Sequence, residues 1–239
     1  MLMSERLRTS TAPCTRNGLF SVMKGICNDE GIDHFSYFSS QYQGVETKAI
    51  IETTHCDEWL KRYHDKHYAQ IDPVIRVGFQ SFLPIDWIEL SMGSAIVKSF
   101  FGEAAEFGVC PNGLTIPIRD ERNGRALFSV NTSMNLVDWE SFKARRSADL
   151  SYLAFLFHEK TRSFYAHHRS EDPSVQLSDR EKEVLLWASE GKTAWETSVI
   201  LGVSKRTIDF YLRNACSKLR TATKTQAVTR AIALGQIRI

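Results

Sequence analysis

The sequence of 239 residues contains no apolar run of about 18 residues, which is the length that a transmembrane helix needs. The first 18 residues are polar and lack the apolar core that marks a secretory signal peptide. Neither an internal repeat nor a low-complexity tract is present. These absences argue against a membrane-spanning, secreted or repeat protein, and they favour a cytoplasmic location.

Cysteine is sparse, and its pattern argues against disulfides and metal. The five cysteines are odd in number and scattered, and they form no C-x-x-C pair, so reduced thiols are expected. Three histidines and one cysteine crowd residues 55–67, but the tight ligand spacings of known zinc modules are absent. No nucleophile signature surrounds Cys110. The sequence therefore predicts no metal, no cofactor and no catalysis.

The net charge of +2 is unevenly distributed along the chain. Residues 177–239 carry 11 Lys and Arg against 6 Asp and Glu, a net charge of +5, whereas residues 1–176 carry a net charge of −3. Of the 26 aromatic residues, 22 lie before residue 177. The basic end therefore suggests a nucleic-acid module, and the aromatic-rich part suggests a domain that encloses an organic ligand.

Residues before 167 alternate between helical and strand patterns. Apolar spacing predicts helices over 17–31, 56–68, 92–107 and 138–166, and Asp72-Pro73 predicts another helix start because proline is tolerated in a first turn. Strands are expected over 33–40, 45–53, 113–120 and 124–133, with a hairpin turn at Asn123-Gly124. This order predicts an α+β fold in which helices flank an antiparallel sheet, an α/β/α sandwich.

Residues 177–239 predict an all-α domain of four short helices. A capping box of Ser178 and Glu181 begins the first helix, and Gly191 ends it. The third helix follows the turn 202–204, and its apolar residues form one stripe: Ile208, Leu212, Ala215 and Leu219. Two helices joined by a short glycine-containing turn, with the second one basic, are typical of a helix-turn-helix, whose exposed face can enter a major groove.

This C-terminal stretch resembles the LuxR-type helix-turn-helix over residues 177–236. The matching positions are Glu181, Leu185, Gly191, Val203-Ser204, Thr207-Ile208 and Lys218-Leu219. The resemblance implies that four residues face the bases: Arg206, Asp209, Phe210 and Arg213. It implies phosphate contacts for four others: Lys205, Thr207, Tyr211 and Lys218. Base contacts would give specificity, and phosphate contacts would give affinity.

The N-terminal part carries a second resemblance. It shows neither a phosphate-accepting receiver pattern nor a G-x-x-x-x-G-K-[ST] motif. Six residues instead resemble the acyl-homoserine-lactone-binding domain of quorum-sensing LuxR-type receptors: Trp59, Tyr63, Asp72, Pro73, Trp87 and Gly113. The resemblance implies a ligand-responsive transcriptional regulator that binds a palindromic promoter element as a homodimer, with RNA polymerase as a further partner and no membrane.

The two resemblances divide the chain into two domains. Residues 1–165 correspond to an autoinducer-binding domain and residues 177–239 to the helix-turn-helix domain. Between them, residues 166–176 are polar, contain Pro173 and lack periodicity, so they are expected to form a linker.

The chemistry of an N-acyl-homoserine lactone suits the N-terminal residues. An indole can only donate a hydrogen bond and an ionised carboxylate can only accept one, so Trp59 suits the lactone carbonyl and Asp72 suits the amide N–H. The resemblance implies that Ser129 contacts the amide carbonyl, that Trp87 packs against the lactone ring, and that Tyr63 closes over the ligand. Without ligand, Asp72 and Trp59 are expected to lack hydrogen-bond partners.

Departures from the resemblance concern the specificity of the site. His55 stands where well-known members carry a tyrosine that bonds the amide carbonyl, and its imidazole has a shorter reach. Arg125 and Leu127 are expected to shorten the pocket for the tail, while Leu60 replaces an arginine found in some long-chain receptors. These features favour a short, branched or aromatic acyl group, and they leave a different, non-lactone ligand as the alternative.

Overall fold

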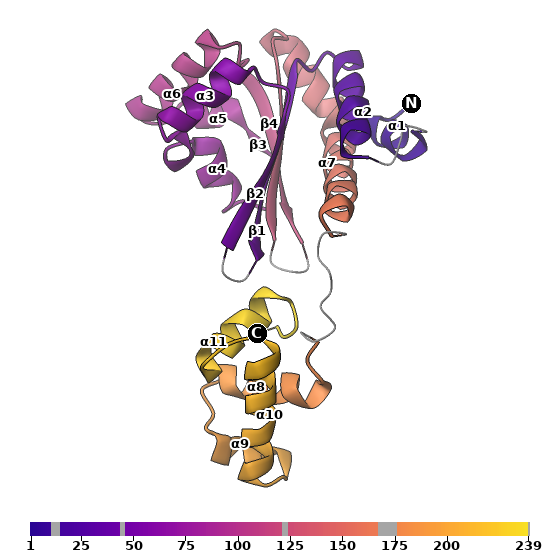
Figure 1. Cartoon of the computed structure of the whole chain (residues 1–239). Helices are drawn as coiled ribbons and strands as arrows, with labels where there is room; N and C mark the ends of the chain where they lie inside the picture. The colour runs from indigo at the N-terminus through magenta and orange to yellow at the C-terminus, as the bar shows by residue number, and fades with distance from the viewer. Residues whose placement is uncertain (11–14, 44–45, 121–123, 167–175, 239) are drawn as a thin grey trace. The chain divides into compact units, whose positions relative to one another are not determined.

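The computed structural model describes residues 1–10, 15–43, 46–120, 124–166 and 176–238. The chain separates into an N-terminal and a C-terminal compact unit (Figure 1). The linker that the sequence predicts over 166–176 falls mainly on residues 167–175, which lie outside the described residues. The predicted domain limits therefore stay a prediction.

The N-terminal unit is built on a five-stranded sheet with the strand order β2-β1-β5-β4-β3. The strands are β1 (His34–Gln43), β2 (Glu46–Thr53), β3 (Ile85–Asp86), β4 (Asn112–Arg119) and β5 (Arg125–Thr132). β1 pairs with β5, β5 with β4 and β4 with β3, each time antiparallel. The four expected strands are confirmed, and the short β3 was not expected. Arg119 pairs with Arg125, but residues 121–123 of the predicted hairpin turn lie outside the described residues.

One face of the sheet is covered by α1 (Met3–Thr9), α2 (Arg16–Asp29) and α7 (Leu136–Ala166), as Figure 1 shows. Alternate strand residues point to this face because the side-chain period of a strand is two. Phe35 on β1 and Phe128 on β5 are completely or almost completely buried there, and both rings pack against Phe157 of α7. This cluster forms the larger core of the unit.

The opposite face is covered by α3 (Asp57–Asp65), η1 (Tyr68–Gln70), α4 (Pro73–Gly78), α5 (Trp87–Ser91) and α6 (Ala95–Glu106) (Figure 1). The predicted α/β/α sandwich is therefore confirmed. The helix expected over 56–68 ends at Asp65 instead. His67 adopts a left-handed conformation with φ of 53°, and the chain then turns Tyr68 into a second aromatic cluster. Packing of Tyr68 thus overrides the helical pattern of the sequence.

The C-terminal unit contains α8 (Asp179–Ser189), α9 (Ala194–Leu201), α10 (Lys205–Lys218) and α11 (Lys224–Ala233). The capping box of Ser178 and Glu181 is present, and Gly191 has the positive φ of a helix-ending glycine. Gly202 also has a positive φ, and Ser204 then caps α10. These local signals confirm the predicted four-helix arrangement. Within the described residues, no helix has the combined length and apolar character that crossing a membrane demands.

Candidate functional site

A cavity of about 210 Å³ lies in the N-terminal unit between the sheet and helices α3 to α6. It is lined by side chains of β1, β2 and β5 on one side and of the helices on the other. All six residues predicted to bind ligand line this cavity: His55, Trp59, Tyr63, Asp72, Trp87 and Ser129. The fold therefore gathers residues from several separate segments around one cavity.

Asp72 occupies the N-cap of α4 and is 8% exposed. One carboxylate oxygen, Oδ1, accepts from the backbone N–H groups of Val74 at 2.7 Å and Ile75 at 3.4 Å. The other, Oδ2, accepts from the Tyr63 hydroxyl at 2.7 Å. Burial raises the pKa of Asp72, while these hydrogen bonds act in the opposite direction. Burial and the charge of Asp72 together raise the pKa of Tyr63, which keeps its proton for this bond.

The expectation that Asp72 lacks partners without ligand is wrong. The N-terminus of α4 and Tyr63 already supply donors. A carboxylate has about four lone-pair positions, so Oδ2 can still accept a further hydrogen bond from the cavity. Tyr63 therefore holds the carboxylate in place in addition to lining the cavity.

Aromatic rings form the wall of the cavity on the helical side. Trp59 is 5% exposed, and its ring centroid lies 5.8 Å from Tyr63 and 6.0 Å from Phe100. The structure shows no hydrogen bond from the Trp59 indole N–H to any described residue. Aromatic packing thus fixes the ring by shape, and the N–H remains available to an acceptor in the cavity.

Trp87 uses its polar group inside the protein. Its indole N–H donates to Thr115 Oγ1 at 2.8 Å, and Thr115 Oγ1 lies 2.8 Å from Ser129 Oγ. A Cβ added at Gly113 would lie 2.3 Å from the Trp87 ring, so glycine is required where the indole crosses β4. Trp87 therefore offers the cavity its ring rather than its N–H, and it fixes the position of Ser129 through Thr115.

His55 lines the cavity beside a second histidine. The His55 and His34 rings lie 4.7 Å apart between centroids, and His34 Nδ1 lies 3.2 Å from the Thr54 carbonyl. Burial, and then the charge of His34, lower the pKa of His55 from 6.5 to about 4. A neutral imidazole at neutral pH can either donate or accept a hydrogen bond, depending on its tautomer.

Stability of the N-terminal unit should fall between pH 7 and pH 5 because of His55. Its pKa is lower in the folded state than its ordinary value of 6.5, so the unfolded chain binds the proton more tightly in this range. We expect a loss of about 1–2 kcal/mol in the free energy of unfolding, to be measured by denaturant titration at both pH values. His55→Gln should remove this loss, while His64→Gln at an exposed site should retain it. An identical pH dependence in wild type and His55→Gln would contradict the prediction.

The residues expected to shorten the tail pocket behave differently from each other. Leu127 lines the cavity, and a Cβ added at Gly78 would lie 2.7 Å from its side chain, so the cavity is tightly closed there. Arg125 is exposed and donates to the Phe79 carbonyl at 3.3 Å. The expectation that Arg125 narrows the cavity is therefore wrong.

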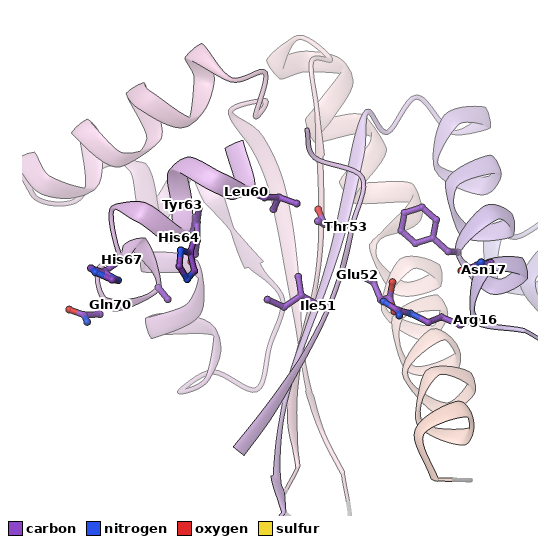
Figure 2. A pocket seen from close by; sticks show the side chains of 12 residues that line it. Arg16, Asn17, Ile51, Glu52, Thr53, Leu60, Tyr63, His64, His67 and Gln70 are labelled. Carbon is purple, nitrogen blue, oxygen red and sulfur yellow. The ribbon is translucent and has the colours of Figure 1, made fainter. Parts of the chain in front are cut away.

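An open groove of about 820 Å³ adjoins the cavity at the edge of the sheet. Figure 2 shows Leu60 and Tyr63 of α3 on one side of β2, with Arg16 and Asn17 of α2 on the other. Ile51 of β2 turns toward α3, whereas Glu52 turns toward α2 and pairs with Arg16 (Figure 2).

Among the described residues, no group of three or more His, Cys, Asp and Glu side chains could hold a metal ion.

In the C-terminal unit, α10 packs by one side and exposes the other. Ile208, Ala215 and Leu219 are fully buried, and Leu212 is partly buried, which confirms the predicted stripe. Three of the four residues predicted to face the bases lie on the exposed side of α10, away from this buried stripe. Arg206, Phe210 and Arg213 are exposed. The fourth, Asp209, is half-buried and forms an ion pair with Lys205 at 3.7 Å.

The residues predicted to contact phosphate differ in exposure and in the hydrogen bonds that they already make. Lys205 is exposed, Tyr211 is half-buried, and the Thr207 hydroxyl lies 2.8 Å from that of the N-cap Ser204. Lys218 donates to the buried carboxylate of Glu181 at 2.7 Å and so links α10 to α8. Burial alone would raise the pKa of Glu181, but hydrogen bonds, above all from Lys218, outweigh it and lower the pKa.

Two family models match the two units. One, described as an autoinducer binding domain, matches residues 15–161, and the other, described as bacterial regulatory proteins of the luxR family, matches residues 175–231. The chain belongs to the LuxR-type transcriptional regulators. It thus combines an autoinducer-binding domain with a LuxR-type DNA-binding domain, and its family consists of regulators rather than enzymes.

Relatives of this LuxR-type regulator match three quarters or more of its length. The transcriptional activator RaiR of Rhizobium etli is 32% identical over 182 residues, which is 76% of this chain and 75% of RaiR. The transcriptional activator VanR of Vibrio anguillarum is 30% identical over 226 residues, 93% of this chain and 92% of VanR. Escherichia coli SdiA has the same fold, with a TM-score of 0.71, 22% identity and coverage of 99% and 97%. SdiA in complex with octanoyl-rac-glycerol matches with a TM-score of 0.69, 21% identity and coverage of 97% and 92%.

Several residues of the regulator's cavity escaped sequence reasoning. Thr115 is fully buried behind the cavity and bridges two predicted residues, yet it appears in the sequence as an ordinary strand threonine. Phe100 and Ala104 of α6 line the cavity at an i, i+4 spacing. That spacing signals a buried helix face but gives no indication that the face borders a ligand cavity.

Proposed function

We propose that this LuxR-type regulator binds an N-acyl-homoserine lactone in the cavity of its N-terminal unit. The observation that carries the proposal is the set of polar groups that meet there among aromatic rings. Asp72 offers an acceptor, Trp59 an indole N–H and Ser129 a hydroxyl. A lactone head carries the complementary groups, namely one amide N–H and two carbonyls.

The amide N–H of the ligand would bond Asp72 Oδ2, which Tyr63 holds in position. The lactone carbonyl would accept from Trp59. Burial of these polar groups is then tolerated because each donor meets an acceptor and each acceptor meets a donor. Tyr63 acts mainly by orienting the carboxylate, and Trp87 provides the ring against which the lactone packs.

The Ser129 hydroxyl would donate to the amide carbonyl. The Trp87 indole N–H donates a hydrogen bond to the Thr115 hydroxyl oxygen, so the Thr115 O–H can in turn donate to the Ser129 oxygen. The Ser129 proton is then free to point into the cavity. This order of donors supports a carbonyl as the partner of Ser129.

A non-lactone ligand is the second candidate. His55 stands where the resemblance expects a tyrosine, and neutral imidazole would accept as well as donate. The related fold of SdiA occurs in complex with octanoyl-rac-glycerol, which is an ester with hydroxyl groups instead of an amide. A ligand whose hydroxyl donates to Asp72 would satisfy the same cavity.

Mass analysis of the bound ligand tests this proposal. The full chain is expressed with and without a panel of acyl-homoserine lactones, purified, and extracted for mass spectrometry. We expect one lactone to be retained at close to one molecule per chain and to raise the yield of folded protein. Retention of a compound without a lactone from every culture, with no lactone retained from the panel, would favour the second candidate.

We further propose that the regulator binds a palindromic promoter element as a homodimer. One recognition helix reads only a few base pairs, so specificity generally needs two half-sites about one helical turn apart. The exposed apolar residues Tyr152 and Phe155 of α7, at 49% and 47% exposure, support self-association. Contact with RNA polymerase in the cytoplasm would complete the role of a transcriptional regulator.

A further inference from the structure

The cavity and the open groove share part of one wall. Five residues line both spaces: Ile51, Thr53, Leu60, Tyr63 and Ala69. They come from the edge strand β2, from α3 and from η1. The cavity and the groove therefore adjoin along these side chains.

The exposure of the lining residues shows which side of the cavity is open. Trp87 and Phe100 on the inner side are 5% and 6% exposed. Ile51 and Leu60 are 56% and 37% exposed, although both also line the cavity. Near Leu127 the wall leaves no room for a Cβ at Gly78, and Arg125, the next residue on that side of β5, does not line the cavity. A ligand anchored on the inner side would therefore extend toward Ile51 and Leu60.

The polarity of the groove changes with distance from the space between Ile51 and Leu60, which we call the gap. Next to the gap its wall is apolar and is formed by Ile51 and Leu60, while Phe20 of α2 adds a further apolar side chain to the lining. Its outer part is polar, and Figure 2 shows His64, His67 and Gln70 at one end and Arg16 and Asn17 at the other. An alkyl chain would thus first meet apolar side chains, and its end would lie among polar groups and solvent.

We propose that the acyl chain of the ligand leaves the cavity between Ile51 and Leu60 and continues in the groove over the edge of the sheet. This inference rests on the proposed lactone head site. It names a ligand class: lactones with long acyl chains, including chains that end in a polar or charged group. It replaces the short acyl group that the sequence favours, because Arg125 does not narrow the cavity.

A charged chain end gives the sharpest test. Binding of two twelve-carbon acyl lactones to the full chain is compared by calorimetric titration, one ending in a methyl group and the other in a carboxylate. A chain end in the groove keeps its carboxylate hydrated, so the two affinities should agree within about 10-fold. If the chain end were enclosed in the cavity, the carboxylate-ended lactone would bind more than about 100-fold more weakly than the methyl-ended one. That result would overturn the proposal.

A blocked gap provides the second test. Ile51→Trp should weaken binding of the methyl-ended twelve-carbon lactone by about 10-fold or more, because the chain would meet an overpacked gap. A four-carbon lactone should bind within about twofold of wild type, because its chain stays inside. Ile96→Trp is the matched control, since Ile96 is 62% exposed on α6 and lines neither space. Equal losses for both lactones, or no loss for either, would contradict the proposal.

Failure of this proposal can be told apart from failure of the head site. Wild-type protein that binds the four-carbon lactone but not the twelve-carbon lactone overturns the groove route alone. Protein that binds no lactone of either length overturns both proposals. Melting temperatures of the variants without ligand establish that each is folded.

Discussion

An Asp72→Asn variant should keep the stability of the ligand-free protein and lose most of its affinity for ligand. Asparagine is as good an N-cap as aspartate, and its oxygen can still accept from Val74. We therefore expect the free energy of unfolding to change by less than about 1 kcal/mol. Loss of a buried charge also relieves the cost of burial that raises the pKa of Asp72.

Affinity should respond more strongly because the amide turns a donor toward the cavity. With its oxygen held by the α4 N-terminus, the introduced asparagine would present N–H groups where the ligand N–H needs an acceptor. Loss of a charge-assisted hydrogen bond costs about 2–3 kcal/mol, which corresponds to about 30–150-fold in the dissociation constant. The rise in melting temperature with ligand should shrink accordingly.

The measurement is a thermal denaturation series with increasing lactone, checked by calorimetric titration. Asp86→Asn is the matched control, because Asp86 also caps a helix with one oxygen, pairs with Lys143 through the other, and does not line the cavity. It should keep the full ligand-dependent shift. If Asp72→Asn keeps that shift too, Asp72 is only a helix cap and the head group lies elsewhere.

The C-terminal unit could be predicted almost completely from local signals. Capping residues act within a few positions of the chain, so Ser178, Gly191 and Ser204 fix where helices begin and end. The partner of Glu181 was not predictable in this way. Its ion pair with Lys218 joins residues 37 positions apart, and only the packing of α8 against α10 brings them together.

In the N-terminal unit, the identity of the cavity residues was predictable but their connections were not. Trp59, Asp72 and Trp87 were found by resemblance, whereas the bonds through Tyr63 and Thr115 depend on tertiary packing. Arg125 shows how this difference leads to error. It lies on the same side of β5 as Leu127 and Ser129, but the cavity ends at Leu127, and Arg125 lies beyond it.

The helix α1 had no signal in the sequence strong enough to predict it. It has seven residues, and its N-cap Leu2 makes no side-chain capping bond to the helix. Its first N–H groups are satisfied by Asp149 of α7, to which the Met3 N–H donates at 2.7 Å. A helix that depends on a carboxylate 146 positions away lies beyond the reach of local pattern analysis.

Substitutions in α10 should separate stability from DNA recognition. Lys218→Ala should destabilise the C-terminal unit by about 2–3 kcal/mol, because the buried carboxylate of Glu181 would lose its cation. This expected destabilisation is smaller than that for breaking a fully buried ion pair, because the Lys218 side chain is 36% exposed. Hydrogen exchange of the α8 and α10 amides in the full chain reports this loss locally.

A double variant provides the control for Lys218. Glutamine also completes a capping box, so Glu181→Gln keeps the cap of α8 without a charge that needs a partner. Adding Glu181→Gln to Lys218→Ala should therefore restore most of the protection from exchange. Wild-type protection in Lys218→Ala alone would contradict the structural role and leave Lys218 as a plain phosphate contact.

Arg213→Ala should have the opposite profile. Arg213 is exposed, and among the described residues its guanidinium donates only to its own helix, at the Asp209 carbonyl. Protection from exchange should therefore stay as in wild type. Binding to a palindromic operator should weaken by about 1–3 kcal/mol, with relaxed preference at one position of each half-site. Lys205→Ala should instead weaken operator and random DNA alike and reduce the dependence of affinity on salt. Titrations of both DNAs at several salt concentrations decide between these roles, and an equal loss on both DNAs for Arg213→Ala would place Arg213 on a phosphate.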